Sequence, residues 1–374
     1  MKIIILGSVL WDSIWGHNQE LTRILSKEHE ITFLEPVVHS SNLNLSFQRT
    51  TKNRVPPNVR IIQRDTNFGL NLIYGVYCEI SNLFYLIKND YDFFVTYYTT
   101  CGLLATLFSR LMGKKVILMY VDDLSELYEP KIAKILTKHV FTPLVTKCSN
   151  LTVTTAYKLK KFINNYSKNV EYIPNGVDLS RFQSNEKSFE DNKNFIIGFV
   201  GSFGEWINYE MILEAAKLFK NNKDIKFLFV GTGEGFNYFN SAINELNLNN
   251  IQLLGVVPHS EVPKILSKVD VCIIPFKINR LTDSVCPVKL FEYWAMEKPV
   301  ISTSFHEIKI IAKDKVIFVD NAVELKNAIL ALKNDEQLRI KYADVGIKEV
   351  KNYDWNILGD KYLRIISKLS KSKV

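Results

Sequence analysis

Cysteine is scarce in this chain of 374 residues, and the five cysteines are odd in number and widely spaced. Most of them stand inside apolar stretches, at Cys78, Cys101, Cys148, Cys272 and Cys286. A disulfide-stapled secreted domain or a structural zinc site needs closely spaced cysteines, so this pattern argues against both. We expect reduced thiols in the core of a cytoplasmic protein.

Long apolar runs are also absent. No segment reaches the roughly 18 unbroken apolar residues that a membrane span needs. The most apolar stretch, 103–112, is interrupted by Thr106, Ser109 and Arg110. The first residues pass directly into a short Ile/Leu run and a glycine, a strand-and-turn pattern that differs from a signal peptide. We expect a protein that is soluble or peripheral at a membrane.

Acidic residues are missing from one long segment. Between Glu129 and Glu171 there is no Asp or Glu, while eight lysines fall inside, at Lys131, Lys134, Lys138, Lys147, Lys158, Lys160, Lys161 and Lys168. The whole chain carries a net charge of +8. The lysines could simply form a solvated helix face. An anionic bilayer fits the acid-free span better, because each lysine near its surface contributes about 1 kcal/mol. Nucleic acid fits poorly, since no recognised binding motif is present. We expect the 131–168 segment to contact an anionic membrane surface.

What the chain does have is a regular alternation of short apolar runs with helical patterns. The runs lie at 3–6, 31–34, 60–63, 93–97, 116–120, 151–154 and 170–173, then at 196–200, 226–230, 251–254, 271–274, 300–302 and 316–319. Continuous apolar runs of this kind predict parallel strands buried on both faces. The length favours two domains. The pattern therefore predicts an α/β protein with two doubly wound Rossmann-like domains.

The domain boundary is predicted between 174 and 194, where a turn and a polar stretch interrupt the alternation. The first domain then covers 1–178 and the second 179–354, with a final helix at 355–374.

The stretch 270–303 holds the most informative chemistry. It predicts a buried strand, a polar loop, a helix that opens at Pro287 and a second strand from Val300. Free amides and the positive dipole end make such a helix start an anion site. Lys289 and Glu292 share one helix face near it. A cation beside free amides suits a diphosphate, and a carboxylate one turn later suits ribose hydroxyls.

The run Pro-Val-Lys-Leu-Phe-Glu-Tyr-Trp-Ala at 287–295 resembles the donor-binding helix of nucleotide-sugar glycosyltransferases with two Rossmann domains, the GT-B kind. It is most similar to "group 1" envelope-polysaccharide enzymes with a Pro-x-Lys-x-x-Glu-Tyr signature. The segment Ile-Pro-Asn-Gly-Val-Asp at 173–178 resembles the family's hinge, and 198–204 and 229–234 resemble its two glycine-rich turns. The loop at 253–257 resembles the one whose backbone holds the base. A glycine after a strand usually serves a tight turn, so the order and spacing of these motifs carry the resemblance. The final helix resembles one that crosses back onto the first domain in the family.

The resemblance implies two Rossmann-like domains facing a cleft. The N-terminal, acceptor-binding domain would cover 1–178 together with the final helix at 355–374, and the C-terminal, donor-binding domain would cover 179–354. The resemblance also implies a nucleotide-diphosphate-sugar site and neither a cofactor nor a required metal. The implied donor-site residues are Gly201, Ser202, Gly231, Gly233, Val257, Arg280, Asp283, Pro287, Val288, Lys289 and Glu292.

The chain departs from the family in two places. The larger family has a Glu-x7-Glu pair whose second Glu matches Glu292, but Ser284 stands at the first position with Asp283 beside it. Relatives also place an Arg and a Lys after the turn of Gly201, and this chain has no cation there. The charge would then come from Lys289, with Arg280 or Lys277 as further candidates. A solvated loop charge is an equal interpretation of Arg280.

Groups that act on the acceptor should follow strands of the first domain. The loop 7–17 offers Trp11, Trp15 and His17 as lining residues, the segment 97–100 follows the fourth strand, and the fifth strand is followed by Asp122 and Asp123.

The two aspartates would point to opposite sides if the strand persists, so one should face the cleft. We predict Asp123 as the catalytic base, with Asp122 and His17 as further candidates. Helix capping is the alternative for the Asp pair, and a structural role is the alternative for His17.

These features predict an enzyme, a glycosyltransferase at the inner face of the cell membrane. It would move a sugar from a nucleotide-diphosphate sugar to a membrane-associated glycan or lipid-linked acceptor, in envelope polysaccharide or glycolipid synthesis. The alternatives are a noncatalytic partner subunit of the same fold and a sugar-nucleotide epimerase. Donor sugar, acceptor and stereochemical course stay open.

Overall fold

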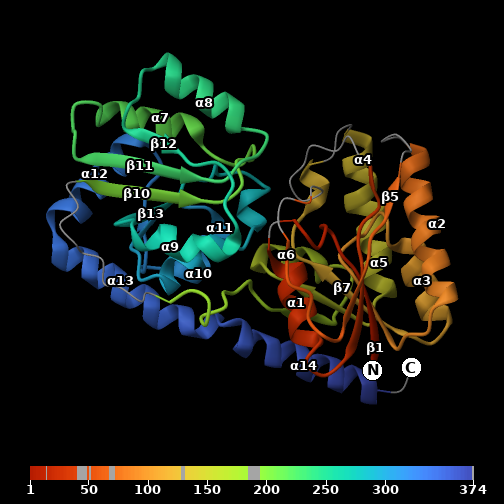
Figure 1. Ribbon diagram of the computed structural model, residues 1–374. Helices are drawn as coiled ribbons and strands as arrows, with labels where there is room; N and C mark the ends of the chain where they lie inside the picture. The colour runs from red at the N-terminus through yellow and green to blue at the C-terminus, as the bar shows by residue number, and fades with distance from the viewer. Residues whose placement is uncertain are drawn as a thin grey trace. The chain divides into compact units, whose positions relative to one another are not determined.

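The computed structural model describes residues 1–13, 15–39, 49, 52–66, 72–127, 131–183 and 194–372. The chain divides into two compact units (Figure 1). Unit 1 contains Met1–Pro174 and Asn356–Val374, and unit 2 contains Asn175–Trp355. Each unit is built on its own parallel sheet with helices on both faces.

Unit 1 contains a seven-stranded sheet in the order β4-β2-β1-β6-β7-β8-β9. Its strands are β1 (Lys2–Leu6), β2 (Glu30–Leu34), β4 (Val59–Ile62), β6 (Phe93–Thr96), β7 (Lys115–Tyr120), β8 (Leu151–Thr154) and β9 (Val170–Tyr172). Every neighbouring pair is parallel. The central strands β6, β7 and β8 are buried along their whole length, as continuous apolar runs predict.

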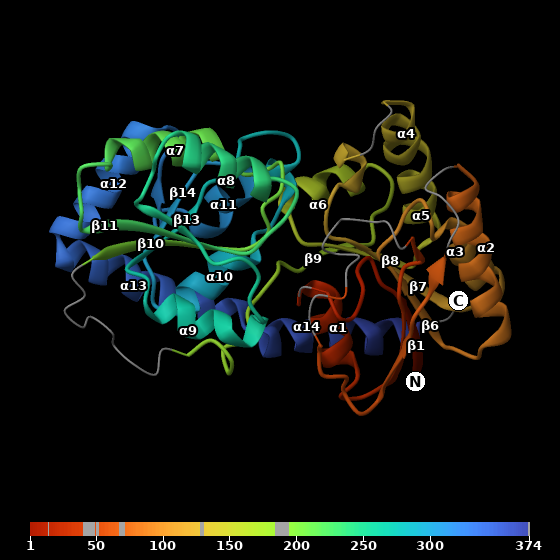
Figure 2. The same cartoon turned by 45° about the horizontal axis from the view of Figure 1, so that its top comes forward.

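Helices cover both faces of this sheet. They are α1 (His17–Leu25), α2 (Leu72–Lys88), α3 (Leu103–Leu111), α4 (Lys131–Leu136), α5 (Thr142–Cys148), α6 (Tyr157–Ile163) and α14 (Trp355–Lys371). A π-helical turn, Thr137–Phe141, joins α4 to α5. The C-terminal helix α14 lies beside α1 (Figure 2), where a Cβ on Gly359 would lie 2.9 Å from Ile24. The predicted return of the final helix to the first domain is confirmed.

Unit 2 contains a six-stranded sheet in the order β12-β11-β10-β13-β14-β15. Its strands are β10 (Phe195–Val200), β11 (Ile225–Val230), β12 (Ile251–Leu253), β13 (Val271–Ile274), β14 (Val300–Ser302) and β15 (Ile317–Phe318). Its helices are α7 (Tyr209–Leu218), α8 (Phe236–Glu245), α9 (Val262–Ser267), α10 (Val288–Ala295), α11 (His306–Ala312), α12 (Ala322–Asn334) and α13 (Glu336–Val350). Figure 2 shows α7 and α8 on one face of the sheet, and α9, α10 and α13 on the other.

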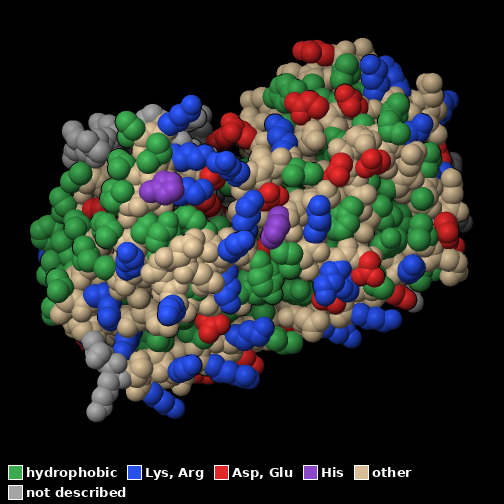
Figure 3. Space-filling model, turned by 180° about the vertical axis from the view of Figure 1, so that it is seen from behind, with side chains coloured by type: hydrophobic (Ala, Val, Ile, Leu, Met, Phe, Trp, Pro, Cys, Tyr) green, Lys and Arg blue, Asp and Glu red, His purple; other side chains and the backbone are tan. Residues whose placement is uncertain are grey.

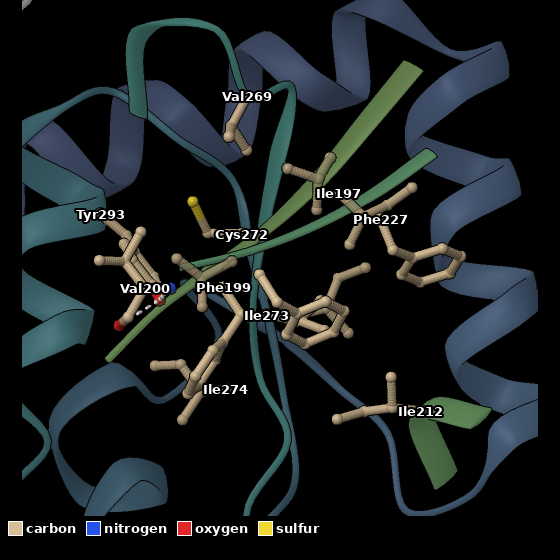
Figure 4. Packing of buried hydrophobic residues seen from close by; sticks show 14 of the residues in the cluster. Ile197, Phe199, Val200, Ile212, Phe227, Val269, Cys272, Ile273, Ile274 and Tyr293 are labelled. Atoms are coloured by element: carbon tan, nitrogen blue, oxygen red, sulfur yellow. Dashed lines mark hydrogen bonds between the residues drawn. The ribbon is translucent and has the colours of Figure 1, made fainter. Parts of the chain in front are cut away.

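The core of unit 2 fixes the position of α10. Figure 4 shows Phe199, Ile273 and Tyr293 among the side chains packed around the central strands. The hydroxyl of Tyr293 accepts a hydrogen bond of 2.9 Å from the amide of Val200 and lies 3.3 Å from the carbonyl oxygen of the same residue. Helix α10 is therefore tied to the last residue of β10, at the edge of the sheet where the strands end.

Every apolar run predicted as a strand is a strand of one of the two sheets, with ends that differ by no more than one residue. A further parallel pair, β3 (Val38–His39) with β5 (Asp65–Thr66), was not predicted. All five cysteines are free thiols. Among the described residues, no helix is both long enough and apolar enough to cross a membrane.

Candidate active site

Helix α10 begins at Val288, one residue later than predicted. Pro287 takes the N-cap position with an extended backbone, φ −76° and ψ 112°, and offers no side chain that could cap the helix. The amide of Leu290 donates to the Pro287 carbonyl over 3.2 Å. The amides of Val288 and Lys289 have no acceptor among the residues that the structure describes. The start of α10 therefore combines free donors with the positive end of the helix dipole.

Lys289 is held beside this helix start. Its ammonium group lies 5.2 Å from the centre of the Phe199 ring and 5.0 Å from the centre of the Phe276 ring. Burial lowers the pKa of Lys289 to about 8, against the opposing effect of the nearby Glu292 charge. A Cβ on Gly201 would lie 2.9 Å from Lys289 Nζ, and the φ of 152° at this residue also favours glycine. The arrangement presents a poorly hydrated cation next to free amides, which suits a phosphate.

Glu292 lies one turn further along α10 and is 9% exposed. Its Oε1 atom is 2.8 Å from Nε2 of His259, in the short 3₁₀ turn that follows the loop of Val257. The ring of Phe182 lies 5.4 Å from the His259 ring. The carboxylate is thus fixed in orientation by a residue that sequence reasoning missed. No local pattern marks His259, because its partner belongs to a different motif.

The glycine-rich turns after β10, β11 and β12 pack directly on one another. The amide of Gly201 donates to the Val230 carbonyl over 2.9 Å, and that of Gly231 donates to the Gly255 carbonyl over 2.7 Å. A Cβ on Gly231 would lie 2.0 Å from the Gly201 oxygen, and one on Gly233 would lie 2.6 Å from the Phe203 oxygen. These glycines allow three backbone turns to meet at the edge of the sheet.

The loop before α10 explains part of the departure from the family pattern. The buried hydroxyl of Ser284 donates to the Arg280 carbonyl over 3.1 Å, which closes the loop on itself. The Asp283 carboxylate accepts the amide of His306 over 2.9 Å, at the start of α11. The Arg280 side chain is exposed on this loop, while Ser202 and Val257 are partly buried. Donor-binding roles for these residues stay predictions.

In unit 1, Asp122 faces a small concavity beyond the end of β7. Hydroxyl-bearing side chains dominate its lining, which comprises Tyr97, Tyr98, Thr99, Thr100, Tyr120, Ser125, Thr137 and Thr142 with Asp122. The surrounding protein removes water from the carboxyl group, and the Asp123 charge lies nearby. Together these effects raise the pKa of Asp122 to about 7.

Asp123, the first-choice base from the sequence, lies in a different environment. It is buried and accepts hydrogen bonds from the hydroxyls of Tyr120, over 3.1 Å, and of Ser125. Its Oδ2 atom forms an ion pair of 3.0 Å with Lys138. Asp123 therefore joins β7 to the π-helical turn, while Asp122 lines the concavity. The geometry favours Asp122 over Asp123 as a proton acceptor.

His17 is buried between two tyrosines. Its Nδ1 atom lies 2.7 Å from the Tyr97 hydroxyl and its Nε2 atom lies 3.1 Å from the Tyr362 hydroxyl on α14. Burial lowers the pKa of His17 to about 3, so the ring is neutral. Through Tyr97 it supports the wall of the Asp122 concavity. Trp11, predicted as a lining residue, is instead buried against Phe33.

Comparison with known proteins adds to this geometry. Residues 180–349 match the family described as glycosyl transferases group 1. Unit 2 therefore carries the match to the group 1 glycosyltransferases. The glycosyltransferase TuaH of Bacillus subtilis, named for teichuronic acid biosynthesis, is 26% identical to this chain over 228 residues, or 58% of this chain and 56% of TuaH. The chain thus spans little more than half the length of this curated relative.

Solved structures show the fold that surrounds the group 1 domain. Sucrose-phosphate synthase from Thermosynechococcus elongatus superposes with a TM-score of 0.78 at 14% identity, covering 98% of both chains. Anabaena HepE in complex with UDP and glucose gives a TM-score of 0.73 at 13% identity, covering 98% of this chain and all of HepE. At such identities the likeness concerns the fold alone, and that fold is GT-B. The predicted fold class is confirmed.

Proposed function

We propose that the protein transfers a sugar from a nucleotide-diphosphate sugar to a hydroxyl group of a glycan or lipid-linked acceptor. The observation that carries this proposal is the start of α10. There Lys289 lies beside free helix amides, and Glu292 follows one turn later with its carboxylate fixed by His259. Lys289 and the free amides suit a diphosphate, and the Glu292 carboxylate suits the two hydroxyls of a ribose.

Lys289 stabilises the departing diphosphate in this proposal. When the acceptor oxygen forms its bond to the anomeric carbon, the bond from that carbon to the diphosphate oxygen breaks. The negative charge left on the diphosphate is met by Lys289 and by the amides of α10. We therefore propose that no metal is required, and that transfer persists in the presence of a chelator.

Asp122 receives the acceptor proton. A carboxylate with a pKa near 7 is well matched to this role at neutral pH, because it is substantially ionised and still basic. The concavity has a volume of about 10 Å³, enough for one hydroxyl group, and the tyrosine and threonine hydroxyls that line it are suitable partners for that group.

The acceptor class is supported by the relatives and by the charge of unit 1. TuaH is named for teichuronic acid biosynthesis, and HepE was solved with UDP and glucose. In the 131–168 segment, Lys134 and Lys138 are paired with Glu126, whereas Lys131 and Lys147 are exposed. We propose a peripheral location at the inner face of the cell membrane and a role in envelope polysaccharide or glycolipid synthesis.

Nucleotide binding tests the donor site first. A thermal-shift screen with UDP-, GDP- and dTDP-sugars identifies the base, and calorimetry then compares wild type with Lys289→Ala. We expect nucleoside diphosphate affinity to fall about tenfold or more and nucleoside affinity to change little, because Lys289 contacts phosphate. Lys264→Ala, an exposed lysine on α9, is the matched control.

Two other results would change the proposal. An equal loss for both ligands in Lys289→Ala would assign Lys289 to folding and remove the main support for a donor site. Tight nucleotide binding with no transfer to any lipid-extract or glycan acceptor would favour the noncatalytic relative, which Ser284 in place of a glutamate permits.

A further inference from the structure

Helix α2 exposes one apolar stripe to solvent. Val76, Ile80, Phe84 and Ile87 recur at helical spacing along it, and Phe84 is 56% exposed. Its opposite side faces the core, where Asn82 is among the buried residues. A helix that packs against a sheet with one face needs a single apolar stripe, and α2 has a second one on the outside.

Helix α3 is amphipathic, but three of its four leucines face solvent and its small residues face the core. It exposes Leu104, Leu107 and Leu111, while the buried positions are taken by Ala105, Thr106 and Ser109. Leu111 is 86% exposed. A soluble helix would place its leucines inward and its polar residues outward, so the pattern implies that the outer side faces something other than water.

The α4–α5 segment repeats this reversal. Its exposed apolar residues are Ile132, Ile135, Leu136, Val140 and Leu144, and its buried residues include Thr137, Thr142 and Thr146. Ile132 is 70% exposed. The exposed apolar residues of α2, α3 and α4–α5 are called the apolar face below.

The three helical segments form one continuous surface. The Glu79 carboxylate on α2 accepts the amides of Leu103, over 2.9 Å, and Leu104, over 3.1 Å, which joins α2 to the start of α3. Helix α3 in turn packs against α5. In Figure 3, hydrophobic side chains gather at the left edge, which is the α2–α3 edge of Figure 1, with basic side chains around them. Single exposed apolar residues are ordinary, but a patch spread over three helices indicates a binding surface.

The charges around the apolar face indicate the kind of partner. These helical segments contain one acid, Glu79, and six bases, of which Lys134 and Lys138 are paired with acids of the preceding turn. The other four bases are Lys88, Arg110, Lys131 and Lys147. Protein–protein interfaces are depleted in lysine, whereas lysines around an apolar helix face are typical of binding to an anionic bilayer. The charge and the apolar side chains therefore favour the same partner.

We propose that the apolar face of unit 1 lies in the headgroup region of an anionic bilayer and inserts its aliphatic side chains among the lipids. This deepens the proposed function. Thr137 and Thr142, on the inner side of the same segment, line the Asp122 concavity. A lipid-linked acceptor therefore reaches Asp122 from the membrane to which unit 1 is bound.

Vesicle flotation of the full chain tests the proposal directly. Vesicles of phosphatidylcholine with a third of phosphatidylglycerol are compared with pure phosphatidylcholine. We expect Leu111→Gln with Ile132→Gln to weaken binding to the mixed vesicles more than about tenfold, because two inserted side chains are lost. Leu218→Gln with Val323→Gln removes two exposed aliphatic residues of unit 2, which are 44% and 59% exposed, and should bind like wild type.

The charge contribution is separated by Lys131→Gln with Lys147→Gln, which should reduce binding to the mixed vesicles alone. Unchanged melting temperatures show that all variants fold. Wild-type binding by the Leu111→Gln, Ile132→Gln variant would overturn the proposal. The proposal would also fail if the wild type bound no vesicles but formed a dimer that the Leu111→Gln, Ile132→Gln variant does not form. The apolar face would then join two copies of the chain. The nucleotide affinity of the wild type is measured in parallel. A wild type that binds vesicles but no nucleotide would count against the donor site and not against the membrane surface.

Discussion

Glu292 and His259 are 33 residues apart in sequence but 2.8 Å apart in the structure. The pair shows why single residues of this site act together, since the carboxylate that we propose for ribose binding is oriented by a ring from another loop. Because this hydrogen bond already holds the carboxylate in place, less conformational entropy is lost when a ligand binds to it.

We expect Glu292→Ala to weaken donor-nucleotide binding about tenfold or more, because the hydrogen bonds to ribose are lost. His259→Ala should cause a smaller loss by the same route. The double variant should bind no worse than Glu292→Ala alone, since His259 acts through Glu292. Calorimetry measures all three, with the exposed Glu214→Ala on α7 as control. Additive losses would show that His259 contacts the nucleotide independently.

The two aspartates after β7 should respond differently to the same change. Asp122→Asn should retain the fold and donor binding but lose transfer on the order of 10²-fold, because the proton acceptor is gone. Asp123→Asn should lower the melting temperature, because Lys138 loses one of its two charged partners and keeps only Glu126. Activity assays and thermal melts of both variants measure this. Full activity in Asp122→Asn together with inactivity of a folded Asp123→Asn would return the base to Asp123.

The sequence identified this Asp pair but ranked its members by strand alternation. That rule fails because β7 ends at Tyr120, before either aspartate. Beyond the strand, side-chain direction depends on partners such as Ser125 and Lys138, which are brought in by tertiary packing. Lys289 and Glu292 were placed correctly on one helix because helical spacing is a local property.

At the scale of elements, the glycine turns set how closely three loops of unit 2 approach. Gly231→Ala should destabilise the fold by about 2 kcal/mol or more, because the new methyl would meet the Gly201 carbonyl and the backbone φ is 130°. Urea unfolding measures this. Gly255→Ala is the matched control, since φ is 70° but no atom lies within 4 Å of its Cβ. It should cost about 1 kcal/mol, from backbone strain alone. Equal losses would show that contact with Gly201 is unimportant.

The elements themselves were largely predictable. Continuous apolar runs identify buried parallel strands, and their alternation with helices gives the doubly wound topology. The pair β3 and β5 was missed because two-residue strands are too short to show any period. The reversed polarity of α3 was also missed, because a pattern shows that a helix has two faces but not which face packs inward.

At the scale of the whole molecule, the two units contribute groups that titrate in opposite senses. Asp122 must be ionised to accept a proton, so activity rises as pH increases through about 7. Lys289 must be charged to bind diphosphate, so activity falls as pH increases through about 8. We expect a bell-shaped dependence of kcat/KM with a maximum between these values.

Variants assign each limb of this profile. Asp122→Asn should flatten the acid limb of the residual activity, and Lys289→Arg should move the alkaline limb upward, because arginine stays charged. Steady-state rates across the neutral range measure both. If the acid and alkaline limbs of the pH profile stayed unchanged in these variants, groups other than Asp122 and Lys289 would be responsible for them.

The hydroxyl of Tyr293 and the missing side chain of Gly201 also determine how this domain can be engineered. Both features join α10 to the end of β10, so the donor-binding helix is not an independent module. In a chimera that takes its 281–303 segment from a relative, the grafted helix would lie against the strand end and the turn of this chain. Donor preference should therefore transfer between homologues when the turn at 198–204 is exchanged together with that segment.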